Sequence, residues 1–421
     1  MSNRVRALLI TSSCIVMFYV LLGGLLGKND SPNEKTYRNL NVYSEVMSRI
    51  KSDYVTEPDL KKVTGGAIRG LLEALDPYST YMSPQEYQEY MKQPEPGPGD
   101  LGIFPAKRLG FATVVSVLPG SPAEKAGVKV GDLVDRVENV SARELSVVQL
   151  QRMLAGAPGT TVNMTLVREA RGDPQKVPIT RAILSYPPVV AKVVDDNDAY
   201  LRVASFNKGK AAEIAAKLKE LIAGGADKII LDLRNCAGGD PQEAVETGSL
   251  FIEKGLIAYL QGQQFPRKDL PAVSQGQTFR NPLVVLINQS TAGPAELVAS
   301  AVAANKRGEV VGTRSFGVGV YQKLIPIDDG SALLLSVAKY YGPDGKAIQD
   351  NGVVPTVVEA PGEDTSAADE DNEPAEPEHY GDKDDQQLRK AIEVLKQKGA
   401  KTASHLPHPV GESGQVLSQF S

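Results

Sequence analysis

Two apolar runs in the second half of the chain constrain its fold more than any other feature. Lys228–Asn235 reads KIILDLRN and ends in a Gly-Gly turn, and Leu283–Asn288 reads LVVLIN and leads directly into helix-forming residues. Short apolar runs bounded by turn residues are typical of buried strands. A strand over Leu201–Phe206 and a helix over Gly209–Ala223 continue this alternation. Residues 183–359 are therefore predicted to form an α/β core.

A second pattern occupies residues 96–182. Pro119–Gly127 reads PGSPAEKAG, and Val128–Val134 reads VKVGDLV. An amphipathic helix is expected over Leu145–Leu154, followed by a Pro-Gly turn and an alternating strand over Val162–Val167. This pattern resembles PDZ domains, which are rich in β-structure and carry two helices. Such domains bind a peptide C-terminus as an added strand, with loop N–H groups on its carboxylate.

The PDZ resemblance implies a peptide-binding groove. Judged by its spacing along the sequence from Ser121, the loop that would hold the carboxylate comprises Leu101, Gly102, Ile103 and Phe104. The competing loop is Leu109-Gly110-Phe111. On the helix, Val148 and Gln151 are expected to border the groove. A PDZ domain that serves only as a spacer is the alternative interpretation.

Several motifs resemble the C-terminal processing (tail-specific) serine peptidases, over about residues 40 to 360. They are DPYSTYMSPQEY (Asp76–Tyr87), DLRNCAGG (Asp232–Gly239), NQSTAGPAE (Asn288–Glu296), VGTRSFGVGVYQ (Val311–Gln322) and AKYYGPDGKAIQ (Ala338–Gln349). The resemblance implies a mixed α/β protein with an N-terminal helical segment, a PDZ domain and a peptidase-like core. It implies proteolysis by a serine nucleophile and a lysine base.

The two residues that would carry this chemistry are absent. Alignment with the family motif on Asn288, Glu296 and Phe316-Gly317 places the nucleophilic serine at Gly293 and the lysine base at Val318. Glycine offers no side-chain atom, and valine cannot accept a proton. Gln322 matches the third catalytic position, and on a regular strand it would share a face with Val318. Pro294 also lacks the N–H that commonly helps to hold an oxyanion. We therefore expect an inactive homologue.

In the family, glycine N–H groups contribute to the oxyanion hole at the position of Gly238 and Gly239. Here these N–H groups are expected to bind a carbonyl or carboxylate, with a plain tight turn as the alternative. Two other functions stay open: an active endopeptidase with Ser290 or Thr291 as a displaced nucleophile, and a purely structural envelope protein. The lysines available to such a displaced nucleophile, Lys306 and Lys323, are expected to be ordinary surface residues.

Composition excludes other hydrolytic schemes. All three histidines lie in the polar tail, at His379, His405 and His408. The folded body therefore has no histidine for a Ser-His-Asp triad or a zinc site. The two cysteines, Cys14 and Cys236, lie in such different settings that no disulfide is expected. No metal or cofactor is predicted, and a net charge of −5 with mixed signs gives no patch for nucleic acid.

The N-terminus resembles a membrane anchor. Arg4 and Arg6 precede an apolar run, Ala7–Leu26, that is long enough as a helix to cross the roughly 30 Å core of a bilayer. Positive charge before the run favours a cytoplasmic N-terminus. Residues 1–28 are predicted as a single-pass inner-membrane anchor, with the bulk facing the periplasm or the cell exterior. A cleaved signal peptide is the alternative, although no A-x-A-like site follows.

The remaining segments flank the two domains. Residues 29–95 are predicted to be helical, with a stop at Asp76 and Ser83 capping a new helix. In residues 360–421, an acidic disordered linker is expected to precede an amphipathic helix over Asp384–Lys398 and a polar tail. The expected partners are protein C-termini and an active peptidase paralogue. Self-association through the terminal helices is implied by the family.

Overall fold

The computed structural model describes residues 17–18, 32–92, 97–108, 110–168, 172–195, 197–274, 278–361 and 380–403. The chain divides into two compact units, Met1–Ile68 and Arg69–Ser421. The predicted membrane-spanning run Ala7–Leu26 lies outside the described residues except for Met17 and Phe18. Most of the predicted acidic linker and all three histidines also lie outside them. Among the described residues, no helix is long and apolar enough to span a bilayer.

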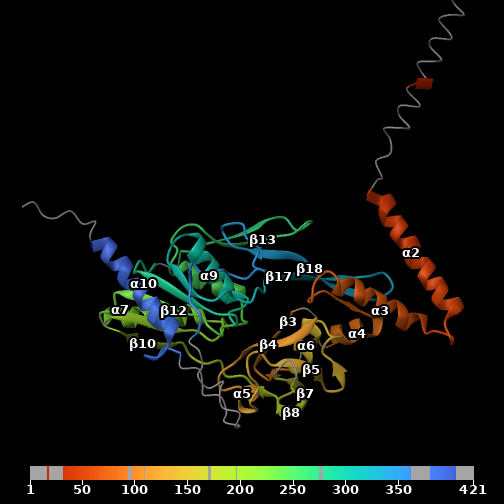
Figure 1. Cartoon of the computed structure of the whole chain (residues 1–421), viewed down its shortest axis with the longest axis horizontal. Coiled ribbons are helices and arrows are strands. Elements are labelled where there is room, and N and C mark those ends of the chain that lie inside the picture. Colours follow the sequence, from red (N-terminus) through yellow and green to blue (C-terminus); the bar gives the residue numbers. More distant parts are fainter. Residues whose placement is uncertain are drawn as a thin grey trace, which may run out of the picture. The chain divides into compact units, whose positions relative to one another are not determined.

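The N-terminal unit is helical. It contains α2 (Pro32–Asp53) and most of α3 (Leu60–Glu73), which continues into the second unit (Figure 1). The apolar residues that recur at helical spacing on this helix are Tyr43, Val46, Met47 and Ile50. Tyr43 and Val46 are exposed, and Met47 and Ile50 are only partly buried, so none of the four is buried within the described chain.

The segment after α3 contains a strand that the sequence did not indicate. The helix stop at Asp76 is followed by β1 (Thr80–Met82) and then by α4 (Pro84–Lys92). The capping box predicted at Ser83 is confirmed. The Ser83 N–H donates to the Glu86 carboxylate at 2.7 Å, and the Glu86 N–H donates to the Ser83 Oγ at 3.3 Å.

The PDZ domain is built on a sheet of order β3-β4-β5-β7-β8, with β6 paired to β5 and β3 at one edge. Its elements are β3 (Ile103–Arg108), β4 (Phe111–Val117), α5 (Pro122–Lys125), β5 (Leu133–Val137), β6 (Val140–Ser141), α6 (Val147–Leu154), β7 (Thr161–Val167) and β8 (Gln175–Thr180). Short strands β2 (Gly99–Asp100) and β9 (Ala182–Ile183) pair where the chain enters and leaves the domain.

The core is a six-stranded sheet of order β10-β11-β12-β15-β16-β19. The antiparallel edge strand β10 (Val190–Val194) precedes five strands that pair in parallel: β11 (Asp198–Arg202), β12 (Lys228–Asp232), β15 (Leu283–Ile287), β16 (Glu309–Gly312) and β19 (Val357–Val358). Both predicted apolar runs are central strands, and every residue of β15 is buried. Burial on both faces explains why these strands read as continuous apolar runs.

Helices cover both faces of this sheet. One face packs against α7 (Lys210–Ala223), α8 (Pro241–Ser249) and α9 (Pro294–Ala304). The other face, which includes Ile230 and Val284, packs against the C-terminal helix α10 (Gln386–Ala403) (Figure 1). The predicted helix Asp384–Lys398 therefore exists, and Leu388 and Leu395 on its apolar face are buried.

A second, antiparallel sheet of order β1-β18-β13-β14, with β17 paired to β18, accompanies the core. Its strands besides β1 are β13 (Leu256–Gln261), β14 (Lys268–Pro271), β17 (Val320–Pro326) and β18 (Ala332–Tyr341). Strand β17 begins two residues after Val318, so this sheet fixes the loop that carries the predicted base position.

Candidate active site

The predicted nucleophile position lies in a sharp turn between strand β15 and helix α9. Gly293 is the residue immediately before the helix, with φ of 64° and ψ of −120°. Apart from its two chain neighbours, no described residue has an atom within 4 Å of a β-carbon built there. A strained strand-to-helix turn that exposes one residue is the arrangement that presents a nucleophile in α/β-hydrolases. The turn thus has the shape and the space for a nucleophile but no side chain.

One buried carboxylate joins this turn to the predicted base position. Glu296 is completely buried and accepts a hydrogen bond from the Gly293 N–H at 2.8 Å. It also accepts from the Ser315 hydroxyl at 2.5 Å, from the Gly317 N–H at 2.7 Å and from the Val318 N–H at 2.8 Å. Burial raises the pKa of Glu296 to about 7, although these four hydrogen bonds favour its ionised form.

The predicted base position is apolar. Val318 packs with residues from both the PDZ domain and the core, and this cluster comprises Phe104, Ala106, Val115, Ala237, Ala292, Phe316 and Val318. Two polar contacts accompany the cluster. The Ser116 hydroxyl donates to the Asn235 carbonyl at 2.7 Å, and the Arg108 guanidinium donates to the Phe316 carbonyl at 3.2 Å. The PDZ domain therefore packs against the place where a lysine base would act.

The two glycines of the predicted oxyanion turn adopt conformations that favour glycine. Gly238 has φ of 75° and Gly239 has φ of 109°. A β-carbon on Gly239 would lie 2.3 Å from the Phe206 backbone, so only glycine fits there. Within the described part of the chain, neither N–H has a hydrogen-bond acceptor. This leaves two donors available to a carbonyl or carboxylate.

Gln322 does not lie in this site. Its side-chain amide donates to the Tyr78 carbonyl at 2.9 Å. The premise that Gln322 and Val318 share a face of one regular strand is wrong, because β17 starts only at Val320 and its register shifts between Tyr321 and Gln322. In this structure Gln322 ties β17 to the Asp76–Tyr87 segment.

The displaced-nucleophile alternative gains no support from the geometry. The Thr291 hydroxyl donates to the Leu233 carbonyl at 2.8 Å and accepts from the Asn288 N–H. Neither Ser290 nor Thr291 is among the residues that line the cavity beside Gly293. No lysine lines that cavity within the described residues, and Lys323 is exposed elsewhere.

A cavity of about 460 Å³ connects the predicted peptide loop with the predicted catalytic positions. Its described lining includes Asp100, Gly102, Ile103, Phe104, Gln151, Gly238, Gly239, Gly293 and Val318. Leu101 of the same loop is fully buried in the PDZ core and does not line the cavity. The fold thus brings most of the predicted site residues, from both domains, to one cavity.

Two predicted groove features lie at other cavities. Val148 lines a smaller cavity with Tyr90 and Arg152 rather than the one beside Gln151. Of the competing carboxylate loop, Leu109 lies outside the described residues, and Gly110 and Phe111 line a cavity of about 670 Å³ formed with Lys107 and Arg143. The loop that starts at Leu101 therefore opens toward Gly293, and the loop at Gly110 does not.

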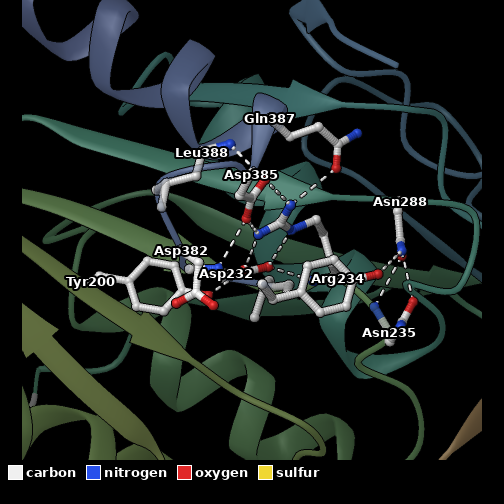
Figure 2. Close-up of polar contacts among 12 residues, drawn as sticks. Tyr200, Asp232, Arg234, Asn235, Asn288, Asp382, Asp385, Gln387 and Leu388 are labelled. Carbon is white, nitrogen blue, oxygen red and sulfur yellow. Dashed lines mark hydrogen bonds and ion pairs between the residues drawn. The ribbon is translucent and has the colours of Figure 1, made fainter. Parts of the chain in front are cut away.

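A buried ionic network lies between the end of strand β12 and the turn that carries Gly238 and Gly239. Arg234 is almost fully buried and pairs with Asp232, the last residue of β12, and with Asp385 just before helix α10, at 2.6 Å for the shorter contact to Asp385 (Figure 2). Burial opposes ionisation of Asp385, but the Arg234 hydrogen bonds and charge outweigh it and lower the pKa of Asp385. The adjacent Asn235 and Asn288 side chains bond each other at 2.7 Å.

The fold and the site together define a class. A PDZ domain lies on an α/β core, and one cavity is lined by the nucleophile-type turn and by two glycines whose N–H groups have no acceptor among the described residues. This is the architecture of a PDZ-containing serine-type peptidase.

The comparisons name the family. The profile of peptidase family S41 matches residues 197–359, a PDZ profile matches 113–168, and the profile "Activating protease CtpB N-terminal domain" matches 24–86. The chain is 31% identical to the carboxy-terminal-processing protease of Bartonella bacilliformis, over 77% of this chain and 76% of that one. The chain therefore belongs to the C-terminal processing peptidase family, as its motifs predicted.

Two further similarities agree with this assignment. The chain is 31% identical to the carboxy-terminal processing protease CtpA of Bacillus subtilis, over 83% of this chain and 74% of that one. Among solved structures, the photosystem II D1 C-terminal processing protease matches with a TM-score of 0.62 and 25% identity, over 76% of this chain and 92% of that one.

Sequence reasoning gave no role to two residues that the structure places at the site. Glu296 served only as an alignment marker, although a glutamate three residues into a helix signals a capping interaction. Asp100 was not noticed, yet its carboxylate accepts a hydrogen bond from the Gly102 N–H at 2.7 Å. An acidic residue directly before the predicted peptide loop was the available signal.

Proposed function

We propose that this protein is a non-cleaving member of the C-terminal processing peptidase family, anchored in the inner membrane with its bulk in the periplasm or outside the cell. It binds polypeptides through the PDZ domain and the adjoining cavity, and it regulates or scaffolds proteolysis by an active paralogue. PDZ domains as a class suggest C-terminal ligands, so protein C-termini are the first partners to test.

One observation carries this proposal: the cavity has neither the serine nucleophile nor the lysine base of the family's mechanism at positions 293 and 318. Position 293 has no side chain, position 318 packs as a valine in an apolar cluster, and the described lining of the cavity has no lysine. Loss of a serine nucleophile in another hydrolase costs roughly 10⁶-fold in turnover. The turn at Gly293 and the Gly238 and Gly239 N–H groups, which have no acceptor among the described residues, support binding of a polypeptide without its cleavage.

Cleavage by the full-length protein in detergent tests the proposal. The substrate is an unfolded protein with an apolar C-terminus. The natural protein should leave it intact, whereas Gly293→Ser/Val318→Lys should gain cleavage, because it restores a nucleophile and a base in a preserved turn. The matched control, Gly293→Ala/Val318→Lys, should stay silent. Any L-residue at position 293 should also cost about 1–3 kcal/mol of stability, because this backbone conformation favours glycine.

The opposite result is equally clear. The proteins named as relatives are proteases, so cleavage by the natural protein is the main competing outcome. If Ser290→Ala or Thr291→Ala then abolishes that cleavage, the nucleophile has been displaced and the proposal is wrong. Absence of both cleavage and polypeptide binding would instead favour a purely structural role.

A further inference from the structure

One N–H group of the PDZ peptide loop already has a carboxylate partner within the chain. Asp100 lies directly before the loop, and its Oδ1 accepts the Gly102 N–H at 2.7 Å. Backbone N–H groups of such loops hold a C-terminal carboxylate in peptide-binding domains. Asp100 thus occupies a donor that a peptide C-terminus would need.

The same carboxylate sets the charge of the cavity. Asp100 is the one charged side chain among the described residues that line the cavity beside Gly293. Arg181 attracts it through space, but the Arg181 guanidinium is bonded to the Met153 and Leu154 carbonyls at 2.6 and 2.9 Å and does not line the cavity. A second carboxylate entering here would meet a like charge, with no cation among the described residues that line the cavity.

The strand that would pair with a peptide is also short of a donor. β3 is the edge strand of its sheet, so a peptide would add along its free side. Pro105 pairs with Val114, whose own N–H and carbonyl bond to Asp132 and Gly131 on the side away from β3. The backbone of Pro105 therefore faces the free edge, where proline has no N–H to offer.

We infer that Asp100 makes this groove select against free C-terminal carboxylates and that its occupant is an internal, extended polypeptide segment. This inference rests on the proposed polypeptide binding, and it replaces protein C-termini with internal segments as the ligand class. An internal segment presents neutral amide groups beside Asp100, so it avoids the like-charge contact. It also brings a backbone N–H that the Asp100 carboxylate can accept.

Paired peptides test the inference. The probe is a fluorescein-labelled apolar decapeptide ending in two alanines, made as the free acid and as the C-terminal amide, which mimics an internal segment. Binding to the full-length protein in detergent is followed by fluorescence anisotropy. The amide should bind at least tenfold more tightly than the acid. In Asp100→Gly the acid should gain at least tenfold. Asp173→Asn, which removes an exposed PDZ carboxylate away from the cavity, should keep the natural preference.

Each outcome decides between the two proposals. Equal binding of both peptides by the natural protein, or tighter binding of the acid, would overturn the inference and leave the proposed polypeptide binding intact. No binding of either peptide by the natural protein and by Asp100→Gly would overturn both. If Asp100→Gly does not fold, as judged by circular dichroism, Asp100→Asn replaces it, since it removes the charge and keeps the side-chain acceptor for the Gly102 N–H.

Discussion

At the scale of single residues, the site depends on a carboxylate that is not itself a catalytic group. Glu296 gathers donors from the nucleophile turn and from the loop that carries Val318, so it holds the two vacant positions together. A buried carboxylate without such donors would be strongly destabilising. Glu296 therefore fixes the geometry between positions 293 and 318, although Gly293 and Val318 carry neither a nucleophile nor a base.

The burial of Glu296 predicts a dependence of stability on pH. Its pKa rises from an ordinary value of 4.5 to about 7 on folding, so the folded protein holds this proton more tightly than the unfolded chain. The contribution of this proton to the free energy of unfolding is fully present below pH 4.5. It is lost as the pH rises from 4.5 through about 7. The free energy of unfolding in urea, measured from pH 4 to 8, should show this fall in the natural protein.

Glu296→Gln is the control for that prediction. The variant does not titrate, so its unfolding free energy should lack this fall between pH 4.5 and 7. It should also be less stable at low pH by about 1–3 kcal/mol, because its amide NH₂ group faces N–H donors. Parallel pH profiles of the two proteins would contradict the assignment of the effect to Glu296.

At the scale of elements, the C-terminal helix depends on a contact at its first turn. Asp385 accepts the Leu388 N–H at 3.0 Å and pairs with buried Arg234 (Figure 2). This contact links α10 to the strand that leads into the Gly238–Gly239 turn. Helix α10 is therefore expected to support the cavity as well as to cover the sheet.

Asp385→Asn should release the helix. Removing one partner of a buried ion pair costs about 3–5 kcal/mol, and the lower end applies because Asp232 stays with Arg234. Hydrogen exchange should accelerate in α10 while the strands of the PDZ domain keep their protection. The neighbouring exposed residue supplies the control, since Asp384→Asn should leave exchange unchanged. Equal exchange in the two variants would show that packing alone holds α10.

At the scale of the whole second unit, the PDZ domain and the core meet through an apolar cluster beside the cavity. Phe104 of the peptide loop lies in this cluster with Val318 and Ala237. Apolar contacts between two domains oppose their independent motion, and we expect them to couple the unfolding of the two domains. We therefore expect the natural PDZ domain and core to unfold in a single transition.

Phe104→Ala should separate these transitions in differential scanning calorimetry, at a stability cost below the about 3–5 kcal/mol of a fully buried phenylalanine. Phe104 is only partly buried, which sets the lower expectation. Phe111→Ala is the control, because Phe111 belongs to the same PDZ sheet but is exposed and lies outside the cluster. A single transition in both variants would mean that other contacts couple the domains.

The sequence by itself determined the family, the PDZ domain, the α/β core and the absence of groups at positions 293 and 318. These follow from local patterns: apolar runs that become buried strands, glycine and proline turns, and motif spacing. The capping box at Ser83 was predictable for the same reason, since its partners are three residues apart.

Only the tertiary structure decided how these parts meet. Gln322 lies outside the site because strand β17 starts only at Val320 and its pairing with β18 shifts register between Tyr321 and Gln322. Simple alternation along the chain therefore does not predict which way Gln322 points. Strand β1 exists because its three residues find a partner strand some 250 residues later. The roles of Glu296 and Asp100 depend on which N–H groups packing brings within hydrogen-bond distance. Local propensity encodes elements, but contacts between distant residues and the burial of charge are properties of the packed molecule.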